Sequence, residues 1–162
     1  MSYHFGEEMK ELIDLLHEDE GLRLHVYDDA TGKPIVAGYT VVGNPTIGYG
    51  RLLTKDRGIT QKEADYLFSN DLQNTIESLR SNYWWFANLD SVRADVCVSM
   101  VYNMGIGRFN GFKKMIAAIE AEDWDEASTQ ILDSRAAREL PARYGRLAEM
   151  MKTGKIPTLI RE

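Results

Sequence analysis

The sequence predicts an α+β fold in which a small antiparallel β lobe and a larger helical lobe are joined by a long helix. Apolar residues recur at helical spacing before residue 21 and again after residue 60, whereas residues 31–60 hold six of the 13 glycines and two of the four prolines. We therefore expect the β lobe at about 21–60, the connecting helix at about 61–81 and the helical lobe at 1–20 and 82–162. At 162 residues the chain has the length of one domain.

The first predicted helix and the β lobe follow from local patterns. Four apolar residues at helical spacing form one stripe: Met9, Leu12, Ile13 and Leu16. Gly21 is a suitable residue to end this helix. The β-branched and aromatic residues of 35–42 predict short strands. Turns are expected at three places: Thr31-Gly32, Gly43-Asn44-Pro45 and Arg57-Gly58.

The connecting helix and the central helix of the helical lobe have clear boundary signals. Thr60 and Glu63 match a capping box and predict the start of the connecting helix. Asp90 is expected to cap a helix over 91–104 that ends at Gly105. This helix is apolar on nearly every side, which is typical of a helix at the centre of a bundle.

The rest of the helical lobe is predicted from shorter patterns. Residues 83–86, Tyr-Trp-Trp-Phe, are aromatic and are expected to enter the core. Cys97 is expected to be an inert buried thiol. Three shorter amphipathic helices follow, around 112–119 and 124–132 and after Pro141, which suits the first turn of the last one.

Composition excludes several classes of protein. The net charge of −6 argues against a general nucleic-acid binder, because phosphate contacts need a basic face. No apolar run approaches the roughly 18 residues of a membrane span, and the N-terminus lacks the pattern of a signal peptide. A single cysteine excludes an intramolecular disulfide. We therefore expect a protein that stays in the cytoplasm after synthesis.

Most common catalytic arrangements are not supported by the residue spacing. The adjacent residues 17–20, His-Glu-Asp-Glu, point in different directions on a helix and cannot share one metal ion. No Ser or Cys lies in a nucleophile-elbow context, and Gly48-Tyr-Gly50 lacks the spacing of a phosphate loop. We expect neither a metal nor a cofactor.

The acidic residues between 18 and 29 support hydrolysis of an acetal. This reaction uses one protonated carboxyl group and one ionised group that attacks or activates water. Glu20, at a helix end beside Glu18 and Asp19, suits the acid, because these surroundings disfavour its ionised form. Asp29 lies in a polar turn and can stay ionised, while the Thr46 hydroxyl could orient the attacking water. A solvated surface position remains the alternative interpretation of each residue taken alone.

The same residues resemble a known family. The segment 19–29, DEGLRLHVYDD, followed by TIGYG at 46–50, is similar to the active-site segment of tailed-phage lysozymes, glycoside hydrolase family 24. Further matches follow in family order and extend the resemblance over nearly the whole chain: residues 63–71, 88–93, 100–105, 111–112, 124–127 and 134–135. The resemblance implies a lysozyme-like fold with the two lobes described above.

The resemblance also implies roles for individual residues. Eight residues separate Glu20 from Asp29, as in the family, so Glu20 would be the general acid and Asp29 the carboxylate that positions or activates water. Thr46 matches the family threonine, and Arg143 matches an arginine that pairs with the catalytic glutamate. Four positions are implied to contact substrate in the cleft: Leu52, Tyr102, Met115 and Gln130.

Three features depart from the family pattern. The stretch between Asp29 and Thr46 is longer than in compact members, which leaves Thr31 and Thr40 as further candidates for the hydroxyl role. Arg51 replaces a histidine that pairs with the acid matching Asp71, and it could make the same pair. The acidic net charge contrasts with basic relatives and could weaken binding to anionic cell walls.

The resemblance implies a monomeric phage endolysin. It would be a muramidase that cleaves the β-1,4 bond between N-acetylmuramic acid and N-acetylglucosamine in peptidoglycan glycan strands, and it would be released from the host cytoplasm through a holin-type pore. Two alternatives stay open. One is a lytic transglycosylase acting on the same bond, and the other is a catalytically inactive wall-binding or virion protein.

Overall fold

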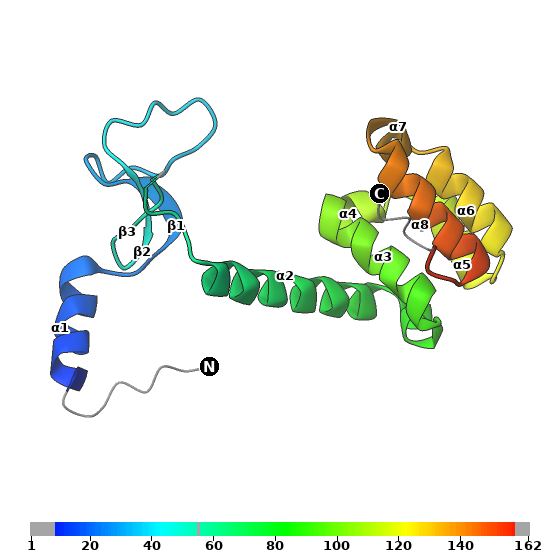
Figure 1. Cartoon of the computed structure of the whole chain (residues 1–162), viewed down its shortest axis with the longest axis horizontal. Helices are drawn as coiled ribbons and strands as arrows, with labels where there is room; N and C mark the ends of the chain where they lie inside the picture. Colours follow the sequence, from blue (N-terminus) through cyan, green and yellow to red (C-terminus); the bar gives the residue numbers. More distant parts are fainter. Residues whose placement is uncertain (1–8, 55, 158–162) are drawn as a thin grey trace. The chain divides into compact units, whose positions relative to one another are not determined.

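The structure is a computed structural model that describes residues 9–54 and 56–157. The chain divides into two compact units, Met1–Ala64 and Asp65–Glu162. In its described residues the first unit holds a helix, a three-stranded antiparallel sheet and the start of a second helix, and the second unit is helical (Figure 1). The predicted α+β class is therefore confirmed. The predicted grouping of residues 1–20 with the helical lobe stays a prediction, and each unit is described by itself below.

The sheet of the first unit is formed by β1 (Arg23–Asp28), β2 (Pro45–Gly48) and β3 (Arg51–Leu52), paired in that order. Tyr27 pairs with Thr46 and Asp28 with Pro45, and Thr46 pairs on its other side with Leu52. The antiparallel register therefore brings the residues that follow Asp28 next to those that precede Pro45.

The expected strands within residues 35–42 are wrong. The connection between β1 and β2 is a long loop in which only Pro34 forms an isolated bridge, to Tyr27. The backbone N–H of Val42, which a ladder would have used, donates instead to the buried Asp28 carboxylate at 2.6 Å. Gly38 has a φ of +83°, which bends the chain away from an extended path. A tertiary hydrogen bond thus overrides the local β propensity.

Helix α1 (Lys10–Glu20) ends where the sequence predicts. Gly21 has a φ of +64° and donates its N–H to the His17 carbonyl, which caps the helix. The left-handed φ favours glycine because other residues would crowd their own backbone there. The carboxyl group of Glu20 is consequently carried by the last helical residue, immediately before the chain turns into β1.

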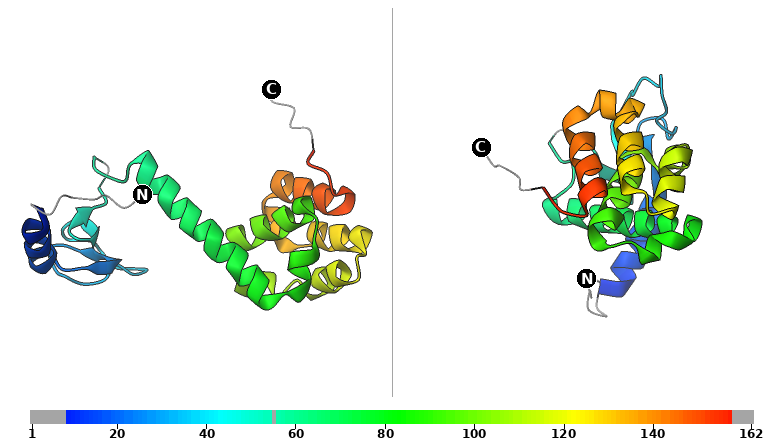
Figure 2. Two further views of the ribbon diagram at one scale, coloured as in Figure 1. Left: turned by 90° about the horizontal axis from the view of Figure 1, so that it is seen from below. Right: turned by 90° about the vertical axis from the view of Figure 1, so that its right-hand side faces the viewer.

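The second unit contains a series of helices (Figure 2). The helices are α2 (Gln61–Asn82), which starts in the first unit, η2 (Trp84–Asn88), α3 (Ser91–Met104), α4 (Ile106–Phe109), α5 (Lys113–Glu120), α6 (Trp124–Leu132), α7 (Arg135–Glu139) and α8 (Pro141–Thr153). The short helices η2, α4 and α7 were not predicted, because fewer than two turns carry little periodic signal.

The predicted helix boundaries at residues 60 and 90 are confirmed. Thr60 donates its N–H to Glu63 Oε2 at 2.7 Å, and Glu63 returns its N–H to Thr60 Oγ1 at 3.3 Å. Asp90 accepts the N–H of Arg93 at 3.0 Å, and α3 ends at Gly105. Both starts therefore satisfy backbone donors that the helices leave unpaired.

The hydrophobic core lies in the second unit, with Val96, Cys97 and Met100 of α3 fully buried. Burial raises the pKa of the Cys97 thiol to about 12, as expected for an inert cysteine. The prediction for residues 83–86 needs correction at Trp84, which is 70% exposed and donates its Nε1–H to Glu120 at 3.1 Å. None of the helices in the described ranges is long and apolar enough to cross a membrane.

Candidate active site

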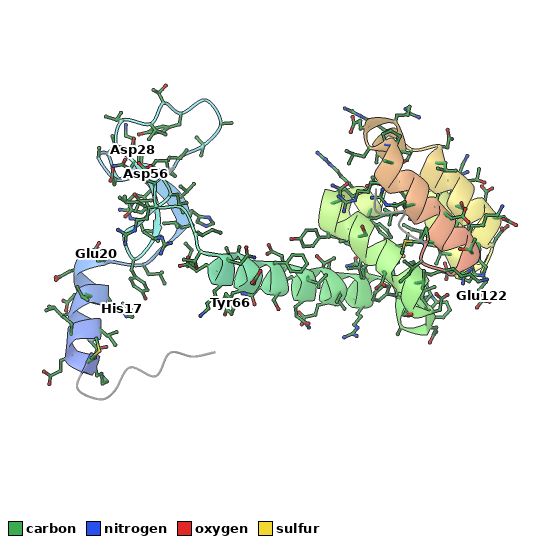
Figure 3. The ribbon with its side chains drawn as sticks, viewed as in Figure 1. His17, Glu20, Asp28, Asp56, Tyr66 and Glu122 are labelled. Carbon is green, nitrogen blue, oxygen red and sulfur yellow. The ribbon has the colours of Figure 1, made fainter. Side chains whose placement is uncertain are left out.

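Glu20 lies at the C-terminal end of α1, directed toward the chain between β2 and β3 (Figure 3). A β-carbon built on Gly50 would stand 2.5 Å from Glu20 Oε2, so a side chain at this position would push the carboxyl group aside. Gly50 also has a φ of +71°, which favours glycine independently. The TIGYG segment therefore allows the carboxyl group of Glu20 to approach its backbone closely.

A hollow of about 420 Å³ surrounds this carboxyl group, lined by residues of α1 and by Tyr49 and Gly50. The His17 ring stacks on Tyr49, with ring centroids 4.0 Å apart and planes 9° from parallel. Ile13 and Leu16 complete the lining. Glu20 is exposed and lines this hollow beside the stacked His17–Tyr49 pair, so its carboxyl group is accessible from solvent.

Of the two adjacent acidic residues Asp28 and Asp29, Asp28 is the buried one. Its carboxylate is fully buried and accepts the N–H groups of Val42, Gly43 and Ala30, at 2.6, 3.0 and 3.0 Å, and the Tyr39 hydroxyl at 3.1 Å. The Val42 N–H, followed by the other donors, lowers the pKa of Asp28 against the opposing effect of burial. Asp28 stays ionised and fixes the loop between β1 and β2.

Asp29 is exposed, and both its oxygens contact one residue, Asn44. Oδ1 accepts the Asn44 N–H at 2.7 Å, and Oδ2 accepts the Asn44 Nδ2–H at 3.1 Å. In return the Asp29 N–H donates to the Asn44 carbonyl at 3.1 Å. An ionised carboxylate has about four acceptor positions, so Asp29 keeps capacity to accept a hydrogen from water.

The Thr46 hydroxyl also contacts Asn44. Thr46 is 2% exposed on β2, and its Oγ1 donates to the Asn44 carbonyl at 3.1 Å. The alternative Thr31 has its hydroxyl on Tyr39 at 2.8 Å, while Thr40 lies exposed on the loop. The structure thus places Thr46, and neither alternative, on the residue that holds Asp29.

The remaining candidates of the first unit are half-buried on β3. Leu52 pairs with Thr46 across the sheet. The Arg51 guanidinium donates to both oxygens of Glu63 at 3.1 Å and to the Gly58 carbonyl at 2.8 and 3.1 Å. Arg51 therefore supports the turn before α2. Its expected pairing with Asp71, an exposed residue of the second unit, stays a prediction.

The candidates of the second unit occupy different environments. Tyr102 is 40% exposed and packs against Phe68, with ring centroids 5.6 Å apart. Met115 is 1% exposed, and Gln130 donates its Nε2–H to Glu126 at 2.8 Å; both line a hollow of about 480 Å³. Of these residues, Tyr102 offers the most side-chain surface to a ligand.

Arg143 lies at the start of α8 and lines a second hollow in this unit, of about 450 Å³. Its Nη2 donates to the carbonyl and the hydroxyl of Ser99 on α3, at 3.2 and 3.3 Å. Arg143 has further donors, so these bonds leave capacity for a carboxylate partner. Its expected pairing with Glu20, which belongs to the first unit, stays a prediction.

The structure thus brings Asp29 and Thr46 together through a residue that the sequence did not indicate. The sequence predicts Asn44 only as part of a turn, Gly43-Asn44-Pro45. The Asn44-Pro45 dipeptide was the available signal, because it marks a restricted turn before a strand. In the described parts of the chain, no three His, Cys, Asp or Glu side chains are grouped as a metal site.

Comparison with known proteins identifies the family. Residues 17–143 match the family described as Phage lysozyme, a range that includes Glu20, Asp29, Thr46 and Arg143. The chain belongs to the phage lysozyme family. The expected family resemblance is thereby confirmed at this level, and the fold is that of a lysozyme-like α+β protein.

Similar proteins come from a eukaryote and from a phage. The chain is 28% identical to Probable T4-type lysozyme 2 of Dictyostelium discoideum over 90% of this chain and 95% of that protein, and 28% identical to Probable T4-type lysozyme 1 over 88% and 94%. It is 29% identical to the pre-baseplate central spike protein Gp5 of Enterobacteria phage T4 over 90% of this chain but only 28% of that protein. The chain therefore spans nearly the full length of the two Dictyostelium proteins but only about a quarter of the phage protein.

Proposed function

We propose that this protein is a muramidase of glycoside hydrolase family 24 that cleaves the β-1,4 bond between N-acetylmuramic acid and N-acetylglucosamine in bacterial peptidoglycan. The observation that carries the proposal is the family match over residues 17–143. The exposed, hydrogen-bonded carboxylate of Asp29 and the hollow around Glu20 supply chemistry that suits it. The names of the Dictyostelium relatives support the same class of enzyme.

In the proposed reaction, Glu20 donates its proton to the glycosidic oxygen as the bond from that oxygen to the anomeric carbon breaks. A water oxygen forms the new bond to the anomeric carbon, and the proton that this water loses passes to Asp29. The products are two shorter glycan chains, one with a new reducing end. Glu20 regains a proton, and Asp29 releases one, through solvent before the next turnover.

Water activation by Asp29 predicts the stereochemical outcome. An inverting reaction needs room for water between the two carboxyl groups, which then lie roughly 6.5–9.5 Å apart when substrate is bound. NMR of the first product formed from soluble glycan should show an inverted anomeric configuration. A retained configuration would mean that Asp29 attacks the sugar directly, and an anhydro-muramic product would favour the lytic transglycosylase alternative.

The decisive experiment compares two variants on permeabilised Gram-negative cells. Glu20→Gln keeps the side-chain volume but cannot donate the catalytic proton, so turbidity loss and release of reducing ends should stop. Glu11→Gln is the matched control, because Glu11 is an exposed residue on the same helix. If Glu20→Gln and Glu11→Gln both lyse the cells as fast as the wild type does, the role of Glu20 is contradicted. A wild-type protein that binds wall material without releasing reducing ends would support the inactive wall-binding or virion alternative.

We further propose an endolysin role, in which the protein acts on the wall as a monomer after a holin-type pore releases it from the host cytoplasm. This part rests on the family resemblance. Expression of the protein in bacteria should leave the culture intact until the inner membrane is permeabilised. Lysis of cells with intact inner membranes would refute the dependence on a pore.

A further inference from the structure

Asn44 contacts two of the three residues that the proposed reaction needs. Its N–H and Nδ2–H donate to Oδ1 and Oδ2 of Asp29, at 2.7 and 3.1 Å. Its carbonyl accepts both the Asp29 N–H and the Thr46 Oγ1–H, each at 3.1 Å. One residue therefore fixes the orientation of the Asp29 carboxylate and the direction of the Thr46 hydroxyl hydrogen.

These bonds have a consequence for the attacking water. Because Thr46 gives its only hydroxyl hydrogen to the Asn44 carbonyl, its oxygen can interact with water only as an acceptor. Asp29, when ionised, is likewise only an acceptor. A water held by both groups must direct its two hydrogens toward them, which leaves an oxygen lone pair to face the anomeric carbon.

The loop between β1 and β2 is built to keep Asn44 in this place. The buried Asp28 carboxylate accepts the N–H groups of Val42 and Gly43, the two residues immediately before Asn44. Pro45 follows, and a residue before proline is restricted to extended backbone conformations. The Tyr39 hydroxyl, which donates to Asp28 at 3.1 Å, ties the middle of the loop to the same carboxylate. Asn44 is therefore restrained on both sides.

We propose that Asn44 is a positioning residue for the hydrolysis: it orients the Asp29 carboxylate and the Thr46 hydroxyl toward one water. This inference rests on the proposed function. It assigns a role to the extended loop that distinguishes this chain, because the loop delivers the amide that holds the water-activating group. Asp28 supports this role because its carboxylate anchors Val42 and Gly43, the residues before Asn44.

The test is a double-mutant cycle between Asn44 and Asp29. Asn44→Ala removes the Nδ2 donor and keeps the backbone groups. Because misplacement of a catalytic group lowers kcat more than it changes KM, kcat should fall roughly tenfold to a hundredfold and KM should stay within about twofold. In an Asp29→Ala background the same change should alter kcat by less than about twofold, because Asn44 then has no carboxylate to orient. Release of reducing ends from purified peptidoglycan measures each rate.

A matched control separates positioning from a loss of loop structure. Val36→Ala shortens an exposed side chain on the same loop and should leave kcat unchanged. Equal losses of kcat from Asn44→Ala in both backgrounds would overturn the positioning role while the proposed function stands. A wild-type protein that releases no reducing ends would overturn both.

A second measurement decides the case if Asp29→Ala shows no residual turnover. The side-chain amide hydrogens of Asn44 should exchange with solvent more slowly than those of Asn70, an exposed residue on α2, when followed by NMR. That protection should disappear in Asp29→Ala. Equal exchange of Asn44 and Asn70 in the wild type would overturn the inference, because Asn44 would then not hold the carboxylate.

Discussion

Replacement of Gly43 by alanine should disable catalysis, because the new β-carbon collides with the Asp29 carboxylate and with the Ala30 backbone beside it. Gly43 has no left-handed φ, so alanine brings no conformational strain of that kind. Its new β-carbon, however, would stand 2.1 Å from Asp29 Oδ1 and 2.8 Å from the Ala30 nitrogen. Ordinary contact begins at 3.4 Å, so the carboxylate must move by about 1.3 Å (3.4 minus 2.1) or the loop must shift.

A displacement of this size sets the expected loss of rate. Misplacing a catalytic group by about 1 Å can cost on the order of 100-fold in rate. That factor corresponds to about 2.7 kcal/mol of lost transition-state stabilisation, at about 1.36 kcal/mol for each tenfold change. We therefore expect kcat for release of reducing ends to fall about 100-fold in Gly43→Ala, with a smaller change in KM, because the collision affects the carboxylate that is proposed to activate water.

Two glycine controls separate the collision from other effects of alanine. Gly107→Ala meets no atom within 4 Å and lies in α4 without a left-handed φ, so it should leave kcat unchanged and should not lower the melting temperature. Gly38→Ala, on the same loop as Gly43, also meets no atom but has a φ of +83°, so it should cost about 1–2 kcal/mol of stability with little loss of kcat. Wild-type kcat in Gly43→Ala would refute the reasoning, because Asp29 would then tolerate displacement.

Three further predictions concern stability and reactivity. The pKa of Asp28 is lowered in the folded protein. Its ionised carboxylate therefore contributes fully to stability above the ordinary pKa of 3.8, and this contribution is lost as the pH falls toward the lowered value. The melting temperature of Asp28→Asn should consequently depend less on pH below about 4 than that of the wild type. With a pKa of about 12, only about one Cys97 thiol in 10⁴ is ionised at pH 8, so Ellman's reagent should react with Cys97 at the rate of unfolding. Rapid labelling of the native protein would contradict the burial of Cys97. Asp90→Ala removes the cap of α3 and should reduce the free energy of unfolding by about 1 kcal/mol in urea titrations, whereas an unchanged midpoint would show that the Arg93 N–H finds another acceptor.

Local sequence signals were sufficient wherever a short stretch carried its own physical constraint. Thr60 with Glu63, Asp90 and Gly105 mark helix boundaries because each of these signals satisfies backbone groups only a few residues away. The burial of Cys97 followed from the apolar surface of its helix on nearly every side. In contrast, Trp84 is exposed although its two following neighbours are buried, because a single turn of helix directs adjacent side chains to different faces.

In the candidate site, too, some features were predictable from the sequence and others were not. Glu20, Asp29 and Thr46 were identified from the sequence through the family resemblance, and the family itself is confirmed by the match over residues 17–143. The burial of Met115 depends on how neighbouring helices pack, whereas the hydrogen bond of Gln130 to Glu126 is a local contact across one turn of α6. A contact position inferred from resemblance therefore specifies a place in the chain but not the surface that the side chain presents there.

The sequence by itself determined the α+β class, the main helices of the second unit and the stretch around Glu20 and Asp29 that resembles the phage lysozyme family. Only the tertiary structure decided how the loop between β1 and β2 is used. Its β-branched residues predict a strand, but a buried Asp28 carboxylate takes the N–H groups that a strand would have needed. The register of β1 with β2 then places Asn44 against Asp29, 15 residues away in the chain. Such a contact depends on strand pairing, which no local propensity records.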